Sequence, residues 1–270
     1  MTVFIVLAVM LAALFIDSRF RLVSTEYTLS YAGLPESFDG FRIVQLSDFH
    51  MADFGGRLIA GVKKQDPDII ALTGDFLNKD PFSSASGQTE RLRPFLEALR
   101  EIAPCYFVSG NHDWASGEIG SLQQMLGEIR VRYLHNECVI IERGEARIIL
   151  AGVEDPNGPA DMIKPDALAE IINDNFPDSF TVMLAHRNDF PVKYPGLDID
   201  LLLCGHGHGG LIRLPLLGGL FGTEHNLFPK YDAGLYDAGS YDMLVSRGLG
   251  GVLPRFLNNP ELVTVILRKS

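Results

Sequence analysis

Polar side chains of the kinds that bind metal ions follow the apolar runs of this sequence one after another. They are acidic, amide and imidazole groups: Asp48, His50, Asp75, Asn111, His112, His186, His206 and His208. The set includes five of the seven histidines of the chain, each within two residues of an aspartate, asparagine or glycine. Unrelated helix caps and turns would not be expected to repeat in this way, so we expect the set to form one site.

Taken singly, each residue has an explanation that needs no metal. An aspartate after a strand, such as Asp48 or Asp75, is most often a helix cap. A lone histidine such as His186 is more often a partly buried, hydrogen-bonded side chain than a ligand. Asn111 after Gly110 is an ordinary turn residue. It is therefore the recurrence of these groups that favours a metal site.

Carboxylate, amide and imidazole ligands without a thiolate suit zinc, iron or manganese. Of these eight groups, even seven ligands are too many for one ion, whereas two divalent ions about 3.5 to 4 Å apart, bridged by a carboxylate and a hydroxide, would use seven. Such a pair activates the hydroxide and neutralises a phosphate group, which indicates phosphoester hydrolysis by in-line attack. The glycines of GHGHGG would let His206 and His208 point at different ions, and in extended backbone Asp48 and His50 would point to one face.

The apolar runs that precede these groups have the length of buried strands. Strands are predicted at 41–47, 68–74 and 105–109, separated by helices at 57–65 and 89–102. This alternation is typical of parallel strands joined by right-handed crossovers. Open α/β sheets bind their ligands at the carboxyl ends of such strands, where the polar groups stand.

The second half of the chain predicts paired strands as well as crossovers. In chain order we expect a helix at 117–129, a hairpin of strands 138–142 and 147–153, a helix from Pro165, strands at 180–185 and 199–205, a Gly- and Pro-rich loop at 209–236, and strands at 241–247 and 261–267. The helix at 89–102 is expected to become regular near Pro94, because proline suits a first turn. These elements predict an α/β domain with mixed sheets.

The amino terminus is an uncharged apolar run of fifteen residues, 2–16. As a helix it reaches roughly 22 Å, short of the roughly 30 Å hydrocarbon core, so it would need Phe20 and its flanks, or a thinner bilayer, to span. No charged segment precedes the run and no small-x-small site follows it, which favours an uncleaved membrane anchor. A cleaved signal peptide and a buried core helix are the alternatives.

We therefore expect an anchor at 1–20, a stalk and entry segment at 21–40 and a catalytic domain at 41–270. Arg19 and Arg21 follow the apolar run and nothing basic precedes it, so the positive-inside rule places the catalytic domain in the cytoplasm.

The composition argues against some classes of partner and site. A formal charge of −11 leaves no broad basic face, so duplex nucleic acid is not expected as a partner, while a small anionic substrate held by a metal is compatible with it. The three cysteines are too few and too widely spaced for a disulfide framework or a zinc ribbon. Cys105 and Cys204 lie in apolar runs and are expected in the core. His135 and His225 have no comparable setting and are expected as surface or loop residues.

The motifs DFH, GD, GNHD, H and GHGH, in this order from Asp48 to His208, resemble the calcineurin-like metallophosphoesterase superfamily. The carboxyl-terminal third resembles its bacterial membrane-associated branch, which includes phosphodiesterases and UDP-2,3-diacylglucosamine pyrophosphatases. The resemblance implies two packed mixed sheets flanked by helices in a four-layer sandwich. It also implies two divalent metal ions.

Carried over residue by residue, the resemblance implies one metal held by Asp48, His50, Asp75 and His208, and the other by Asp75, Asn111, His186 and His206. Asp75 would bridge them. His112 would not bind metal but would act on the substrate phosphate. Some relatives carry an aspartate three residues after the bridging one, which orients this histidine; here Asn78 stands there, and it could accept a hydrogen bond from the imidazole but would stabilise its charged form less.

The expected activity is hydrolysis of a phosphodiester or pyrophosphate bond in a small substrate, with a lipid-linked or nucleotide-type group as the candidates. A phosphomonoesterase at the same site and a non-catalytic membrane-anchored scaffold are the alternatives.

Arg187 and Arg247 are candidates for binding the substrate phosphate, although arginines are more often solvated at the surface. The apolar loop 211–229 is expected to pack as a flap over the core; an acyl-chain groove or membrane contact through Leu216 and Leu217 is the alternative.

Overall fold

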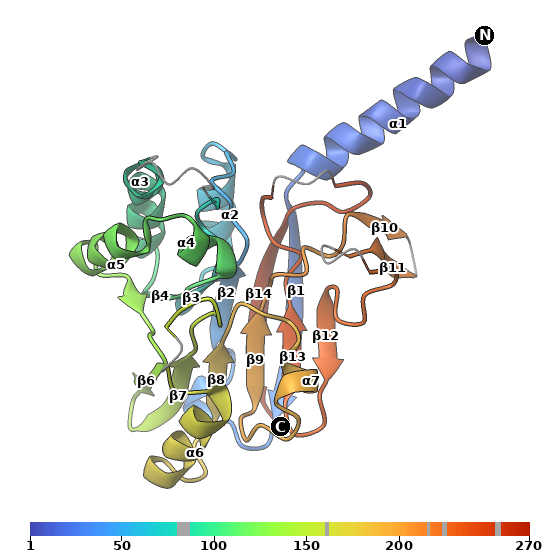
Figure 1. The fold of residues 1–270 in the computed structure, drawn as a ribbon. Helices are drawn as coiled ribbons and strands as arrows, with labels where there is room; N and C mark the ends of the chain where they lie inside the picture. Colours follow the sequence, from blue (N-terminus) through green and yellow to red (C-terminus); the bar gives the residue numbers. More distant parts are fainter. Residues whose placement is uncertain (80–86, 160–161, 215–216, 223–225, 252–254) are drawn as a thin grey trace.

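The computed structural model describes residues 1–79, 87–159, 162–214, 217–222, 226–251 and 255–270. Leu216 and His225 lie outside these residues. In the described part, two six-stranded mixed sheets pack face to face, with helices on their outer faces (Figure 1). This arrangement confirms the predicted α/β class and the two packed sheets.

The first sheet is mostly parallel. Its order is β1 (Val23–Tyr31), β14 (Glu261–Lys269), β2 (Arg42–Leu46), β3 (Ile69–Thr73), β4 (Cys105–Val108) and β5 (Arg132–Tyr133). Strands β2 to β5 run parallel, and β14 is antiparallel to β2 and parallel to β1. A 3-10 turn, η1 (Glu36–Phe38), follows β1.

The second sheet has a parallel centre and antiparallel edges. Its order is β12 (Gly234–Asp237), β13 (Asp242–Val245), β9 (Leu201–Cys204), β8 (Thr181–Leu184), β7 (Ala146–Gly152) and β6 (Glu137–Arg143). Strands β6 and β7 form the predicted hairpin. The predicted loop at 209–236 is partly wrong, since it contains β12 and a hairpin of β10 (Ile212–Leu214) and β11 (Gly218–Phe221). These strands are three or four residues long and each contains glycine or a charged residue, so they lack the apolar runs that identified the others.

Apolar side chains fill three layers of core. Between the sheets lie residues of both, such as Ile69, Val182 and Val265. Helices α2 (Arg57–Lys64), α3 (Gln88–Arg100) and α5 (Ile119–Glu128) cover the first sheet, and α6 (Pro165–Asn175) and α7 (Phe190–Lys193) cover the second. Helices α2, α3, α5 and α6 each bury residues at helical spacing, as Leu92, Leu96 and Leu99 do in α3, whereas the short α7 buries Phe190. Cys105 and Cys204 are buried and unpaired, as predicted.

Helix α3 corrects the prediction made from its proline. The helix begins at Gln88, and Pro94 lies in its interior. The carboxylate of Glu118 accepts hydrogen bonds from the backbone N–H groups of Gln88 (3.1 Å) and Thr89 (2.9 Å), which satisfies two donors that a helix start leaves free. This contact and the buried leucines outweigh the hydrogen bond that Pro94 removes.

The stretch expected to be a stalk instead contributes strand β1. It pairs with β14 over nine residues, from Val23 opposite Glu261 to Tyr31 opposite Lys269. The two strands are more than two hundred residues apart in the chain. Local sequence could not predict this pairing, because alternation in "VSTEYTLSY" is compatible with any edge strand that finds a partner.

Helix α1 (Thr2–Phe20) projects from the body of the protein (Figure 1). It is long and apolar enough to cross a membrane, and only 6% of its apolar window is buried. The buried-core alternative therefore does not hold, whereas a signal sequence would pass the same test of length and composition. Nineteen helical residues reach roughly 28 Å, close to the roughly 30 Å of a hydrocarbon core.

The pairing of β1 with β14 predicts different outcomes for two amino-terminal truncations. A chain beginning at Leu22 keeps both sheets and should unfold cooperatively. A chain beginning at Ala32 lacks β1 and exposes the edge of β14, so its melting temperature should fall by more than about 10 °C or the protein should aggregate. Thermal denaturation and gel filtration measure both, and equal melting temperatures would contradict the structural role of β1.

Candidate metal centre

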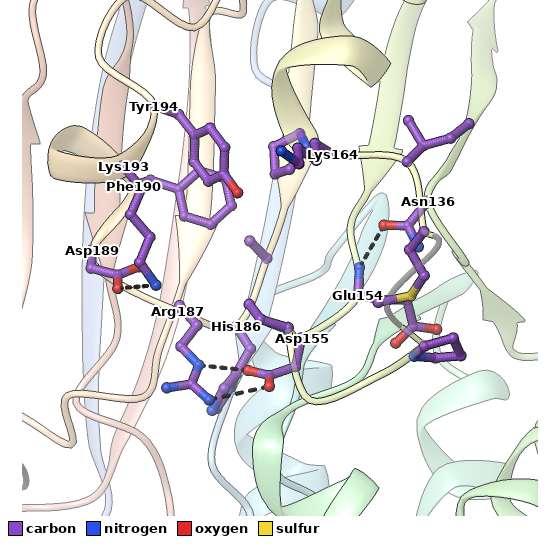
Figure 2. Close-up of a pocket in the computed structure, with 16 residues that line it drawn as sticks. Asn136, Glu154, Asp155, Lys164, His186, Arg187, Asp189, Phe190, Lys193 and Tyr194 are labelled. Carbon is purple, nitrogen blue, oxygen red and sulfur yellow. Dashed lines mark hydrogen bonds and ion pairs between the residues drawn. The ribbon is translucent and has the colours of Figure 1, made fainter.

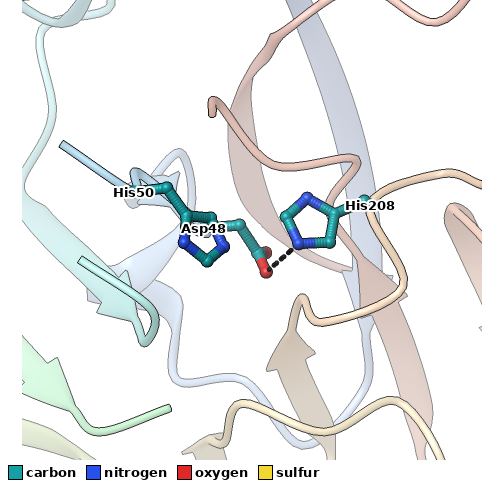
Figure 3. Close-up of side chains that lie close together, drawn as sticks. All are labelled: Asp48, His50 and His208. Atoms are coloured by element: carbon teal, nitrogen blue, oxygen red, sulfur yellow. Dashed lines mark ion pairs between the residues drawn. The ribbon is translucent and has the colours of Figure 1, made fainter. Parts of the chain in front are cut away.

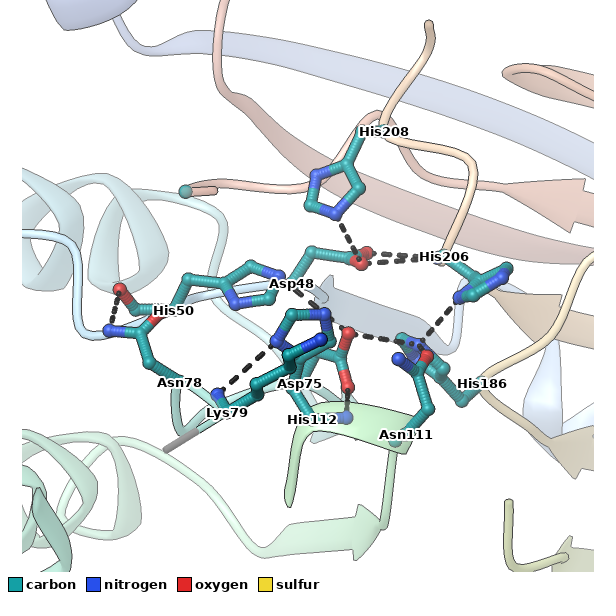
Figure 4. Close-up of polar contacts among 12 residues, drawn as sticks. Asp48, His50, Asp75, Asn78, Lys79, Asn111, His112, His186, His206 and His208 are labelled. Carbon is teal, nitrogen blue, oxygen red and sulfur yellow. Dashed lines mark hydrogen bonds and ion pairs between the residues drawn. The ribbon is translucent and has the colours of Figure 1, made fainter. Parts of the chain in front are cut away.

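All eight predicted site residues lie together where the two sheets present the carboxyl ends of their parallel strands (Figure 4). From the first sheet, Asp48 and His50 follow β2, Asp75 follows β3, and Asn111 and His112 begin α4 (Asn111–Ala115) after β4. From the second sheet, His186 follows β8, and His206 and His208 follow β9. Neighbouring parallel strands thus bring groups from five points of the chain to one place.

The side chains form three overlapping groups that could hold a metal ion. The first is Asp48, His50 and His208 (Figure 3), the second is His50, Asp75 and His112, and the third is Asp75, His186 and His206. Within each group the ligand atoms lie within 4.8 Å of one another. Asp75 shares one group with His50 and another with His186, so it stands between the two ends of the cluster.

The backbone of the cluster is unusual. Its residues Asp48, His50, Asp75, His206 and His208 have positive φ angles of 50°, 48°, 57°, 68° and 50°. The expectation of an extended backbone between Asp48 and His50 is therefore wrong, and a left-handed turn aims their side chains. Few non-glycine residues adopt this conformation, and strained residues persist where packing over-determines them, typically at functional sites.

Two glycines permit the close approach of backbone to the buried aspartates. A Cβ on Gly110 would lie 2.2 Å from Oδ1 of Asp75, and one on Gly205 would lie 2.3 Å from Oδ2 of Asp48. No side chain fits at these distances. In the GHGH motif it is thus the first glycine, before His206, that the packing requires.

Asp113 holds the cluster together, although the sequence patterns did not identify it as a site residue. Its buried carboxylate accepts hydrogen bonds from the backbone N–H groups of Asp75 (2.8 Å), Phe76 (2.9 Å), Leu77 (2.9 Å) and Gly110 (2.8 Å). These bonds join the turn that carries Asp75 to the start of α4. The feature of the sequence that could have identified Asp113 is an acidic residue three positions after the helix cap, Gly110.

The backbone orients the ring of His186, and Asp75 stabilises the protonated form of that ring. Its Nδ1 donates to the carbonyl of Thr73 (2.9 Å), which leaves Nε2 facing Oδ1 of Asn111 (3.1 Å) and Oδ2 of Asp75 (3.2 Å). Burial opposes charge on the ring, but Asp75 overrides it and raises the pKa of His186 to about 10. Burial and the nearby His186 lower the pKa of His206 to about 3, so its imidazole is neutral at pH 7.

His50 provides the test of whether a metal fits. Its side chain is buried, and neither ring nitrogen has a hydrogen-bond partner among the described residues. The nearest carboxylate oxygen, Oδ2 of Asp75, is 3.6 Å from Nε2, beyond hydrogen-bond distance. Buried polar atoms are rarely left unpaired, and burial lowers the pKa of His50 to about 3, so the ring is neutral and able to bind a cation. The donor set therefore fits a divalent ion.

His112 is not oriented as expected. Asn78 donates to the carbonyl of His50 (3.3 Å) and forms no hydrogen bond with His112 in the described structure. The backbone N–H of Lys79 donates to Nδ1 of His112 (3.3 Å) instead. Since Nδ1 accepts, the ring proton of neutral His112 is on Nε2.

The two candidate arginines have different surroundings. Arg187 is held by two hydrogen bonds to Asp155 (2.7 and 3.2 Å), and its Nη1 lies 3.4 Å from Nε2 of His206. Arg247 instead pairs with Glu261 (2.9 Å). Both guanidinium groups thus pair with a carboxylate, but only Arg187 is also in contact with a residue of the cluster. His135, expected at the surface, is exposed and pairs with Glu154.

Comparisons with known proteins agree with this geometry. The profile of the family described as calcineurin-like phosphoesterase matches residues 41–210. Phosphodiesterase YaeI of Escherichia coli is 30% identical over 84% of this chain and 81% of its own. UDP-2,3-diacylglucosamine pyrophosphatase LpxG of Chlamydia trachomatis is 27% identical over 85% of each chain. Sulfate thiohydrolase SoxB of Thermus thermophilus shares the fold, with a TM-score of 0.54 and 13% identity over 87% of this chain and 57% of SoxB.

Replacement of Asp113 should weaken the cluster without removing any of its own side chains. In Asp113→Asn, an amide NH2 would face backbone N–H donors, so the turn of Asp75 would shift. Loss of such a supporting contact typically costs about 10- to 100-fold in metal affinity. Metal titration of Asp113→Asn and of the exposed control Asp174→Asn measures this, and equal affinities would contradict the supporting role.

The protonation of His186 predicts proton release on metal binding. Its raised pKa means that the metal-free ring keeps both protons up to about pH 10. A metal ion at Nε2 must displace one of them, so binding at pH 8 should release a proton and tighten as the pH rises towards 10. Calorimetric metal titrations in buffers of different ionisation enthalpy measure the release. The number of protons released should fall by about one in His186→Gln; an equal release in wild type and variant would contradict the assignment.

Proposed function

The chain belongs to the calcineurin-like phosphoesterase family and is a metallophosphoesterase, and we propose that it hydrolyses a phosphodiester or pyrophosphate bond with two divalent metal ions. The observation that carries this proposal is the cluster itself: carboxylates and imidazoles in overlapping groups, with Asp75 common to two of them. All the ligand positions expected from the motifs are kept, which favours an enzyme over a scaffold.

In this proposal Asp48, His50, Asp75 and His208 hold one ion, and Asp75, Asn111, His186 and His206 hold the other. Zinc, iron and manganese all suit such a donor set. When bound, two divalent ions lower the pKa of a coordinated water and neutralise the phosphate oxygens.

The residues of the chain prepare the site for this chemistry. The backbone carbonyl of Thr73 keeps Nδ1 of His186 protonated, so Nε2 is the atom left for a metal. His112, with its proton on Nε2, is placed to donate a hydrogen bond to a phosphate oxygen or a proton to the leaving alkoxide. Arg187, fixed by Asp155, adds positive charge beside His206.

Two cavities beside the cluster support a diester over a monoester. One has a volume of about 210 Å³ and is lined by His186 and Arg187, with an apolar wall that includes Met162, Phe190 and Tyr194 (Figure 2). The other, of about 340 Å³, includes His50 at the opposite end of the cluster. A phosphodiester or pyrophosphate has an organic group on each side of the scissile bond, so it would occupy both cavities, whereas a monoester would fill one.

Membrane anchoring by residues 1–20 is also part of the proposal. It is supported by the exposed apolar surface of α1 and by Leu217, Leu227 and Phe228, which are 67%, 65% and 58% exposed. These loop residues do not form the expected flap over the core, because their side chains face outward. Membrane fractionation of the full chain and of a chain beginning at Leu22 tests the anchor, which is excluded if both remain membrane-bound.

A lipid-linked substrate is consistent with the anchor and with LpxG, whose name describes a diacylglucosamine pyrophosphatase. The positions of Arg19 and Arg21 favour a catalytic domain on the cytoplasmic side.

Two substitutions should separate metal binding from phosphate chemistry. Asp75→Asn removes the shared carboxylate, so both metal content and cleavage of bis-p-nitrophenyl phosphate should be lost. His112→Asn should keep its metals but lower kcat by roughly 100- to 10,000-fold, since that is the usual contribution of a proton donor. Elemental analysis and turnover on the same preparations measure both. Full turnover of metal-free Asp75→Asn would refute the metal mechanism, and unchanged kcat in His112→Asn would refute the role of that histidine.

A further inference from the structure

The cavity that includes His50 lies beside the carboxyl-terminal end of α1. It is lined by Arg19 and Phe20 of that helix, by His50 of the metal cluster, and by the buried Arg255. We propose that it binds a phosphate group carried by a membrane lipid or lipid-linked ester and so presents that molecule to the metal centre. The inference rests on the proposed function and defines the class of substrate that this side of the site accepts.

Arg255 is the strongest indication of an anionic ligand. It is only 4% exposed. Its Nη2 donates to the carbonyls of Arg247 (2.8 Å) and Gly250 (2.7 Å) and lies 3.2 Å from Nδ1 of His208. Its Nη1 has no hydrogen-bond partner among the described residues. A buried guanidinium nitrogen without an acceptor is costly, and a phosphate oxygen is the acceptor that guanidinium groups bind most strongly.

The charges around the cavity are mainly positive. Burial lowers the pKa of Arg255 to about 10, with the nearby Asp48 acting in the opposite direction and Arg247 and Arg19 adding to the decrease, so the side chain still carries its charge at neutral pH. Arg19 donates from Nη1 to the carbonyl of Gly251 (3.1 Å), which holds its side chain at the wall of the cavity. Asp53 also lines the cavity, but it is exposed and accepts a hydrogen bond from the backbone of Gly55 (2.7 Å).

The carboxyl-terminal end of α1 is connected to the GHGH turn by hydrogen bonds through a segment near the carboxyl terminus of the chain. Ser18 accepts a hydrogen bond from the backbone N–H of Leu257 (2.7 Å), and Asn259 donates to the carbonyl of Asp17 (2.7 Å). The adjacent Asn258 donates to the carbonyl of His208 (2.7 Å). One short segment therefore binds the helix on one side and the GHGH turn on the other.

These hydrogen bonds fix the position of the cavity relative to the end of α1, and therefore relative to a bilayer that α1 would span. If α1 spans as proposed, Arg19 and Phe20 lie at its end, at the level of the lipid headgroups. The phosphates of membrane lipids occupy that level. A lipid phosphate held by Arg19 and Arg255 would lie next to His50 and thus beside the proposed metals.

Binding to the metal-free chain tests the subsite without any catalysis. The full-length protein in detergent micelles is freed of metal with a chelator, which is then removed. Calorimetry measures binding of inorganic pyrophosphate and of dihexanoyl phosphatidic acid to the wild type, Arg19→Gln and Arg255→Lys. The matched control is Arg57→Gln, because Arg57 also contacts the end of α1, through the carbonyl of Phe20 (3.3 Å), but does not line the cavity.

We expect both cavity variants to bind the probes about tenfold more weakly, as for the loss of a charge-assisted hydrogen bond, and the control to change less than twofold. Tighter binding of the phosphatidic acid identifies a lipid as the source of the phosphate, and tighter binding of pyrophosphate identifies a soluble ester; both support the subsite. Wild-type affinity in Arg19→Gln, or no binding of either probe to the wild type, overturns it. Arg19→Gln alters no fully buried side chain, so the test stands if Arg255→Lys does not fold.

Turnover of bis-p-nitrophenyl phosphate by the metal-loaded wild type distinguishes failure of the subsite from failure of the proposed function. Arginine-dependent binding without turnover would refute hydrolysis and keep the subsite. Turnover with arginine-independent binding would refute the subsite alone.

Discussion

Burial of two carboxylates within a cluster of imidazoles is the constraint on which the rest of the structure depends. Asp48 and Asp75 are 0% and 1% exposed. Burial alone would raise the pKa of each, but the neighbouring histidines, His208 for Asp48 and His186 for Asp75, keep both below the ordinary value. Two buried negative charges are stable only with positive partners. The arrangement therefore favours cations, whether a protonated histidine in the metal-free chain or a metal ion.

The constraint extends into the backbone. To aim five of the side chains inward, the chain adopts left-handed conformations that non-glycine residues rarely take. Asp113 supports one such turn through three backbone N–H groups and connects it to Gly110 through a fourth, and glycines stand where a Cβ would collide with a carboxylate. The strain lies at loops after strands, while the regular, well-packed sheets supply the stability that maintains it.

The same interactions connect the cluster to the amino-terminal helix. Asn258 and Asn259 are neighbours in sequence, yet one binds the turn of His208 and the other binds the end of α1. The helix that we propose as an anchor is thus hydrogen-bonded to the body of the protein. Its position relative to the cluster follows from these hydrogen bonds, not from the length of a linker.

The sequence by itself determined the fold class, most strands and the set of residues that could bind metal, because buried strands are apolar runs and the polar groups recur directly after them. It could not predict the pairing of β1 with β14, the helical start before Pro94, or the support of Asp75 by Asp113. Each of these depends on a partner far along the chain: Glu261 to Lys269, Glu118, and the turn after β3. Only the tertiary structure decided them, since local propensities differ by about 1 kcal/mol for most residues and about 3 kcal/mol for proline, and long-range contacts together with the burial of apolar side chains outweigh these differences.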